Sequence, residues 1–178
     1  MWVFGYGSLM WDPGFEHAET RIARLHGYAR SFCMWSIHHR GTVEKPGLVL
    51  ALDEHPGASC DGLAIRVCEG HEHAALNYLR ERELISSAYV EKILPIELAD
   101  GGSVDAVTYV IDAQHDQYCG GMALHEQAEI IATAIGGRGP NPDYLFNTVS
   151  HMAEIGIADP DLEWLAKRVQ QICAAAAQ

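Results

Sequence analysis

Apolar residues are grouped differently in the two parts of the chain, and the grouping predicts strands first and helices last. Up to about residue 111 they form short β-prone runs, with one helical stretch between them. The runs predict strands at residues 2–4, 22–35, 47–52, 63–67, 89–98 and 104–111. Helical spacing predicts helices at residues 71–85, 124–135, 142–154 and from 160 toward the C-terminus. We therefore expect an α+β fold in which helices surround a small, closed, β-barrel-like sheet.

Turn and capping residues separate these predicted elements. Gly27 is expected to bend the strand around it, and both His55-Pro56-Gly57 and Asp100-Gly101-Gly102 are typical of turns. Gly136-Gly137 is expected to end the helix before it, and Asp159-Pro160 is expected to cap the last helix. Because no internal repeat, low-complexity segment or clear linker is seen, residues 1–178 are expected to form a single domain.

Composition and charge indicate a globular protein and argue against nucleic-acid and membrane partners. The 178 residues are 48% apolar and 20% charged, as is ordinary for a globular protein. A formal charge of −12 with scattered basic residues argues against nucleic-acid binding, which relies on a basic patch. No apolar stretch is long enough to span a membrane, and no secretory signal is visible. We expect neither a nucleic acid nor a membrane as a partner.

The cysteines point to a reducing compartment. They are Cys33, Cys60, Cys68, Cys119 and Cys173. The number is odd and no pair has C-x-x-C spacing, so neither a disulfide framework nor a structural zinc site is expected. The first four lie in or next to predicted strands and are interpreted as core residues. We expect a reduced, cytoplasmic protein, and a monomer.

The first residues contain a candidate binding loop. The apolar run Trp2-Val3-Phe4 predicts a buried strand, which leads into Gly5-Tyr6-Gly7-Ser8-Leu9. The two glycines are expected to allow backbone angles closed to other residues and to bring N–H groups close to a ligand. Backbone donors in such a loop are suited to a carboxylate or a carbonyl oxygen.

A second candidate is a carboxylate in the helix predicted at residues 71–85. At about 100° per residue, Leu76, Leu79 and Glu83 share one face. If that face packs on the core, burial raises the pKa of Glu83, and the carboxyl group can then accept and return a proton near neutral pH. In the alternative, Glu83 lies solvated at the helix end and pairs with Arg80 or Arg82.

Other motifs favour ordinary roles. A dinucleotide fingerprint is incomplete because Met10 stands where the third glycine should be. Ser8 lacks the Gly-x-Ser-x-Gly setting of a nucleophile. No histidine pair has the spacing of a zinc-protease helix, so no metal site is expected. Tyr118 is either a buried aromatic residue with a satisfied hydroxyl group or a residue of the site.

Six segments match, in order, the pattern of one protein family. They are residues 2–11, residues 30–32, residues 39–42 with 45–47, residues 78–83, residues 117–120 and residues 139–145. Together they resemble the ChaC-like γ-glutamylcyclotransferases, and the resemblance covers residue 2 to about residue 170.

The resemblance implies a fold, an activity and a set of site residues. The fold is a small β-barrel with helices around it. The activity is a lyase reaction that converts glutathione to 5-oxoproline and Cys-Gly without a metal or organic cofactor. Glu83 matches the catalytic glutamate, and Tyr118 matches a tyrosine of the site. The γ-glutamyl-binding loop is matched by Gly5, Tyr6, Gly7, Ser8, Leu9 and Met10.

The chain departs from the family pattern in the loop around His38-His39 and, more clearly, just after Glu83. Ser87-Ala88-Tyr89 stands where relatives typically have Gly-Gly-Tyr, and the change is expected to stiffen a loop that covers the substrate. Two alternatives remain beside the glutathione-specific enzyme. One is a cyclotransferase for other γ-glutamyl peptides or amines, and the other is a non-catalytic binding or regulatory protein of the same fold. The presence of Glu83 favours an enzyme.

Overall fold

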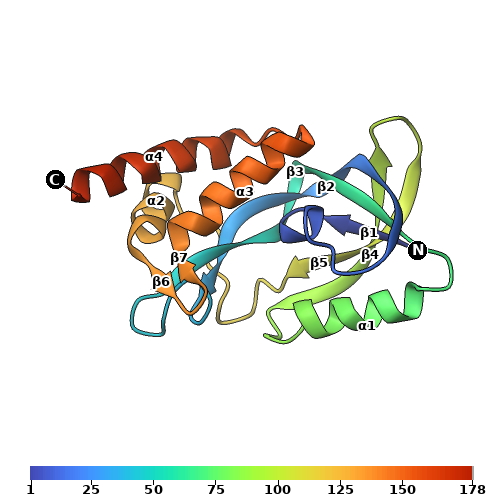
Figure 1. The fold of residues 1–178 in the computed structure, drawn as a ribbon, viewed down its shortest axis with the longest axis horizontal. Coiled ribbons are helices and arrows are strands. Elements are labelled where there is room, and N and C mark those ends of the chain that lie inside the picture. The colour runs from blue at the N-terminus through green and yellow to red at the C-terminus, as the bar shows by residue number, and fades with distance from the viewer. Residues whose placement is uncertain (178) are drawn as a thin grey trace. The chain divides into compact units, whose positions relative to one another are not determined.

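Five strands close into a barrel in the computed structural model, which describes residues 1–177 (Figure 1). Around the barrel the strands follow the order β1-β3-β2-β4-β5. They are β1 (Trp2–Gly5), β2 (His17–Ser36), β3 (Gly47–Val67), β4 (Tyr89–Leu98) and β5 (Ser103–Ile111). This arrangement confirms the predicted barrel-like α+β fold.

The short strand β1 lies between two partners that come much later in the chain. Val3 pairs with Ile65 of the antiparallel strand β3 and with Val107 of the parallel strand β5. β4 and β5 form the predicted hairpin, in which Gly101 and Gly102 both have positive φ. Because β1 is held on both edges, the loop that follows it starts from a fixed point.

Two strands are longer than the apolar pattern predicts. The predicted strands at 47–52 and 63–67 are parts of one strand, β3, which continues through the polar residues between them. The prediction of a turn at residues 55–57 is wrong in this respect: the chain stays in the strand, and Gly57 takes a φ of 86°. Residues 54–57 are exposed, so they lack the apolar alternation that marks a strand packed on a core.

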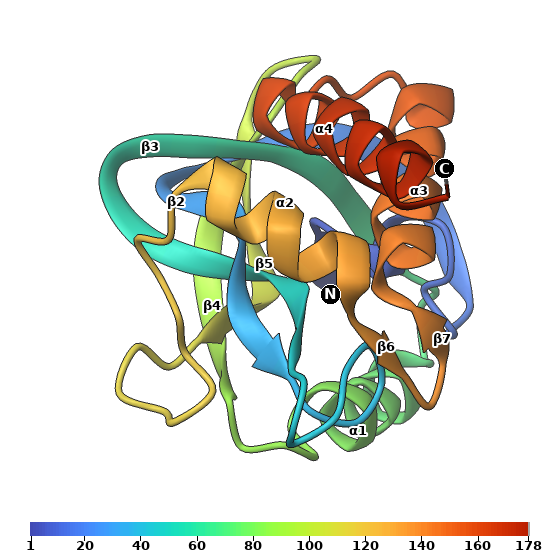
Figure 2. The ribbon, with the colours of Figure 1, turned by 90° about the vertical axis from the view of Figure 1, so that its left-hand side faces the viewer.

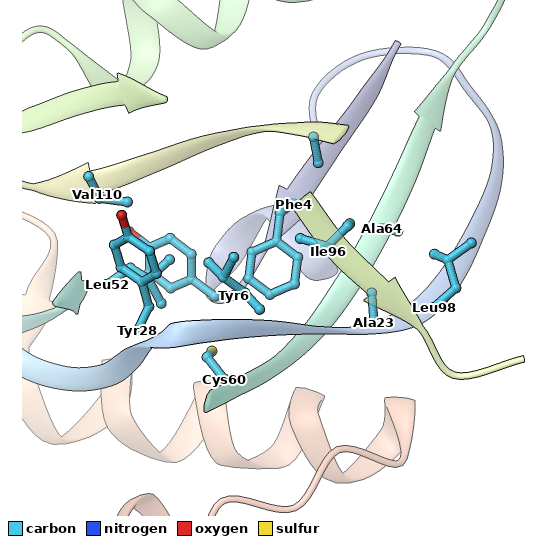
Figure 3. Packing of buried hydrophobic residues seen from close by; sticks show 12 residues of the cluster. Phe4, Tyr6, Ala23, Tyr28, Leu52, Cys60, Ala64, Ile96, Leu98 and Val110 are labelled. Carbon is cyan, nitrogen blue, oxygen red and sulfur yellow. The ribbon is translucent and has the colours of Figure 1, made fainter. Parts of the chain in front are cut away.

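The strands enclose a hydrophobic core (Figure 3). Phe4 and Tyr6, from β1 and the loop after it, lie among residues of the four other strands. The remaining members of this cluster are Ala23, Leu25, Tyr28, Leu52, Cys60, Ala64, Ile96, Leu98, Ala106 and Val110. Gly62 of β3 is required beside it, because a Cβ there would collide with the carbonyl oxygen of Gly5.

Helix α1 (Glu72–Glu83) covers a second cluster of buried residues. Ala75 and Leu79 of α1 pack against Leu9 and against residues of β1, β3 and β5. Leu9 belongs to a single 3₁₀ turn, η1 (Ser8–Met10), that follows β1. The apolar face of α1 therefore brings the end of this helix and the N-terminal loop to the same side of the barrel (Figure 1).

Three further helices contact one another (Figure 2). They are α2 (Leu124–Thr133), α3 (Asn141–Ile155) and α4 (Pro160–Ala176). The predicted cap of α4 is confirmed, since the Asp159 side chain accepts a hydrogen bond from the N–H of Leu162 at 3.1 Å. The predicted end of α2 at Gly136-Gly137 is wrong. Gly136 belongs to strand β6 (Ile135–Gly136), paired with β7 (Gly139–Pro140), and a Cβ on it would collide with the backbone of residues 39–41.

The chain divides into two compact units, and the candidate site residues belong to one of them. The first unit comprises residues 1–31 and 51–118, and the second comprises residues 32–50 and those from 119 onward. The expectation of one domain over residues 1–178 stays a prediction, and its last residue lies outside the part that the structure describes. Within residues 1–177, no helix is both long and apolar enough to cross a membrane.

Candidate active site

The loop after β1 folds into a tight turn that leaves backbone donors at its start. The N–H of Met10 donates to the carbonyl oxygen of Gly7 at 2.9 Å, and the N–H of Asp12 donates to that of Ser8 at 2.8 Å. No side chain caps the turn at Gly7, so the N–H groups of Ser8 and Leu9 have no partner within η1. The N–H of Met10, one of the expected donors to a ligand, is therefore already hydrogen-bonded inside the loop.

The glycines of this loop leave room that a side chain would fill. Neither Gly5 nor Gly7 has a positive φ, and the expectation of backbone angles closed to other residues holds only for Gly7, whose φ of −138° and ψ of −132° lie in neither the α nor the β region. A Cβ on Gly5 would lie 3.3 Å from both the Cβ of Leu9 and the backbone nitrogen of Met10, so Gly5 allows the turn to fold back closely. A Cβ on Gly7 would meet no atom within 4 Å, so the loop faces open space at this point.

A buried arginine fixes the loop to the barrel. The side chains of Tyr6, Leu9 and Met10 are buried, so these residues can present only backbone atoms to a ligand. Nη1 of Arg30 in β2 donates to the carbonyl oxygens of Tyr6 and Asp61, both at 2.9 Å. The sequence pattern does not show what Arg30 contacts, although a guanidinium inside an apolar strand signals a specific partner.

Glu83 is the last residue of α1, and its side chain is 18% exposed. Burial raises the pKa of its carboxyl group, and the positive charge of Arg82 acts in the opposite direction. On the predicted apolar face, Leu79 is fully buried and Leu76 is half-buried. The alternative was a solvated Glu83 paired with a neighbouring arginine. The carboxylate does pair with Arg82, but its side chain is largely shielded from water.

Arg82 connects this carboxylate to the N-terminal loop. Its Nε lies 3.3 Å from Oε1 of Glu83, and its Nη2 donates to Oγ of Ser8 at 2.8 Å. Its Nη1 donates to the carbonyl oxygen of Asp12 at 2.8 Å and to the hydroxyl of Tyr78 at 3.3 Å. One guanidinium thus joins the end of α1 to both sides of η1.

A second network lies near Glu83. Arg80 donates two hydrogen bonds to the carboxylate of Glu91, at 2.8 and 2.7 Å, and the Tyr109 hydroxyl donates to the same carboxylate at 3.0 Å. The bonds from Arg80 keep the pKa of Glu91 low. Burial raises the pKa of Tyr109, and the charges of Glu91 and Glu83 add to this effect. The site thus contains one carboxylate held ionised and another that takes up a proton more readily.

Tyr118 is held by a different part of the barrel. It is half-buried, and its hydroxyl donates to Oδ2 of Asp53 in β3 at 2.7 Å. Its hydroxyl is therefore satisfied, and its role in binding stays a prediction.

The other candidate groups show no assembled centre. Cys33 and Cys60 are buried, while Cys68, Cys119 and Cys173 are half-buried, and all five are free thiols. Within the described part of the chain, His, Cys, Asp and Glu side chains form no group of three or more able to hold a metal ion.

Comparison with known proteins covers nearly the whole chain. The family described as ChaC-like protein matches residues 1–172. The chain is 35% identical over 174 residues to the glutathione-specific γ-glutamylcyclotransferase of Escherichia coli (strain K12), which covers 98% of this chain and 74% of that protein. It is 33% identical over 178 residues to γ-glutamylcyclotransferase 2-3 of Arabidopsis thaliana, covering 97% and 89% of the two chains.

A solved structure has the same fold. The crystal structure of a glutathione-specific γ-glutamyl cyclotransferase from yeast superimposes with a TM-score of 0.84 at 22% identity, over 97% of this chain and 99% of that one. The fold, the matched length and the identity to these relatives agree with the resemblance seen in the sequence. The chain belongs to the ChaC-like protein family.

Proposed function

We propose that this protein is a glutathione-specific γ-glutamylcyclotransferase, which converts glutathione to 5-oxoproline and Cys-Gly. One observation carries the proposal: a shielded carboxyl group, Glu83, is joined through Arg82 to the glycine-containing loop of residues 5–10. Relatives 30–35% identical to this chain bear the name of this activity. The substrate is a small molecule, and the reaction includes no metal or organic cofactor, because the attacking amine belongs to the substrate.

Glu83 moves the proton in the proposed reaction. As a carboxylate it takes a proton from the substrate's α-ammonium group, and the free amine attacks the γ-carbonyl carbon to close a five-membered ring. The attack forms the new C–N bond and gives a tetrahedral intermediate, which collapses as the bond to the cysteinyl nitrogen breaks. Glu83 returns its proton to that nitrogen, and the second proton lost by the ring nitrogen leaves with the ammonium group of Cys-Gly. A carboxyl group whose pKa is raised by burial suits this two-way transfer near neutral pH.

The loop supplies binding and charge stabilisation. The tetrahedral intermediate carries an oxyanion, and the N–H groups of Ser8 and Leu9 at the start of η1 are the donors we assign to it. The backbone of Gly5, Tyr6 and Met10 shapes the loop, and the open space at Gly7 receives the γ-glutamyl group. We assign Tyr118 to the substrate site as well.

We further propose that the protein works as a cytoplasmic, single-domain monomer. The cytoplasm is kept reducing by glutathione, and the free thiols of this chain are compatible with that compartment.

The test is production of 5-oxoproline by the purified protein. Glutathione and, separately, γ-glutamyl-alanine are incubated with the wild type, with Glu83→Gln and with Glu81→Gln. Glu81 lies exposed on the same helix and serves as the matched control. We expect product from glutathione, near-normal turnover by Glu81→Gln, and a loss on the order of 10²-fold or more in Glu83→Gln, because an amide cannot carry the proton.

Each contrary result has a distinct meaning. Equal turnover of γ-glutamyl-alanine would indicate a broader cyclotransferase. A folded wild type that makes no product from either compound would favour a binding protein. A Glu83→Gln variant with normal turnover would overturn the proposed mechanism.

A further inference from the structure

Arg82 occupies a position between the two halves of the candidate site. Its guanidinium makes four polar contacts, to Glu83, Ser8, Asp12 and Tyr78. Only 22% of its side chain is exposed, and its contacts with Glu83 and Ser8 are partly shielded from water, whereas those with Asp12 and Tyr78 lie at the surface. An exposed ion pair between neighbouring residues would have little effect, but this group spans two segments about seventy residues apart in sequence.

The geometry of the side chain suits this position. A guanidinium presents five donors in a rigid plane, so Nε can face Glu83 while the two terminal nitrogens face the loop. The bond to Ser8 holds the first residue of η1, and the bond to Asp12 holds the chain just after the turn. Movement of the loop relative to Glu83 would break at least one of these contacts.

We propose that Arg82 is a positioning residue that keeps the carboxylate of Glu83 aligned with the substrate-binding loop. The inference rests on the proposed function and goes beyond it by assigning the group that aligns the proton carrier with the oxyanion donors. Such alignment matters because a displacement of about 1 Å at a reacting centre can reduce the rate roughly 10²-fold.

Arg82 also influences when Glu83 is ionised. Two ionisable groups interact electrostatically with this carboxyl group: Arg82 on its own helix and Tyr109 from β5. Tyr109 in turn donates to Glu91 of β4, which is paired with Arg80. Arg80 and Glu91 neutralise each other in a bidentate pair, and the Tyr109 hydroxyl is uncharged at neutral pH. Arg82 is therefore the neighbour whose positive charge lowers the pKa of Glu83.

Two substitutions separate position from charge. Arg82→Gln removes both the charge and the planar group of donors, whereas Arg82→Lys keeps the charge but not the ability to contact Glu83 and the loop together. We expect kcat/KM for glutathione to fall roughly 10- to 100-fold in both variants. In Arg82→Gln the acidic limb of the pH–rate profile should move to higher pH, because loss of the positive charge makes Glu83 harder to ionise. In Arg82→Lys this limb should stay nearer its position in the wild type.

The controls keep the proposal falsifiable. Arg168→Gln removes an arginine from α4 in the second compact unit and should leave kcat/KM and the pH profile unchanged. Circular dichroism of each variant excludes unfolding. Normal kcat/KM and an unmoved acidic limb in Arg82→Gln would overturn the proposal.

A second measurement does not depend on turnover. Titration of the side-chain carboxyl carbon of Glu83 by ¹³C NMR should show a higher pKa in Arg82→Gln than in the wild type, and an unchanged titration would contradict the link between the two groups. If the wild type makes no 5-oxoproline, the proposed function fails, while this titration still tests whether Arg82 acts on Glu83.

Discussion

Ser87 is held in a backbone conformation that favours glycine, and replacing it should stabilise the protein. Its φ is 58°, and it is the single non-glycine residue with positive φ within residues 1–177. It lies just after α1, where its N–H donates to the carbonyl oxygen of Leu84 at 3.2 Å. Ser87 is also one of the positions at which the sequence departs from the Gly-Gly-Tyr of the family it resembles, so a departure from that pattern coincides with a strained conformation.

The size of the effect follows from two opposing contributions. A left-handed conformation costs a non-glycine residue about 1–2 kcal/mol, which Ser87→Gly would relieve. Glycine also makes the unfolded chain more flexible, which costs about 0.4–1 kcal/mol of stability. The net gain should be about 1 kcal/mol, which for a chain of this length raises the melting temperature by roughly 2–4 °C.

Thermal and urea denaturation of Ser87→Gly and of Ser86→Gly measure this balance. Ser86 is the matched control, because its φ is not positive and its Oγ accepts a hydrogen bond from the N–H of Ala88 at 3.4 Å. Ser86→Gly should therefore lower the melting temperature. If Ser87→Gly lowered it by as much as Ser86→Gly does, the backbone at Ser87 would not be strained and the reasoning would be wrong.

Three further predictions test the loop, the carboxylate and the core. Gly7→Val fills the open space at this loop and should raise the KM for glutathione at least ~10-fold, whereas unchanged KM would place the substrate elsewhere. Burial raises the pKa of Glu83 in the folded protein, so folding is favoured when this carboxyl group is neutral. This contribution to the free energy of unfolding is fully present below the unfolded pKa of about 4.3 and is lost as pH rises through the folded pKa. Glu83→Gln should thus be more stable than the wild type in urea at about pH 8, with the difference shrinking toward pH 4; a constant difference would contradict this. Leu79→Ala, at a fully buried position of α1, should lower the free energy of unfolding by about 2–5 kcal/mol, and a loss below 1 kcal/mol would show that α1 is loosely packed.

The elements that the sequence predicts best are those whose apolar residues all face one core. The bounds of β4 agree with the predicted run at 89–98, and α1 lies within the predicted helix at 71–85. β3 was divided in the prediction because residues 54–57 are exposed and show no alternation. The predicted end of α2 is wrong because Gly136 is needed for another reason: in the folded chain its backbone packs closely against that of residues 39–41.

The candidate site was predictable as a set of residues but not as an arrangement. Helical spacing placed Glu83 on the face of Leu79, and the structure shields it there. The contacts made by Arg30 and Arg82 join segments that are 24 to 74 residues apart, and no local pattern encodes such pairs. A guanidinium beside an apolar stripe can be noticed in a sequence, but its partners become visible only after folding.

The position of β1 between β3 and β5 has a consequence for the order of assembly. Trp2 is synthesised roughly one hundred residues before its parallel partner Ala106. At about 5–20 residues per second, synthesis of that interval takes on the order of 5–20 s, during which one edge of the first strand has no partner. The barrel therefore closes only after most of the chain has been made. The loop that follows β1 takes its final place late, together with the closing of the barrel, although its residues are synthesised long before those of β5.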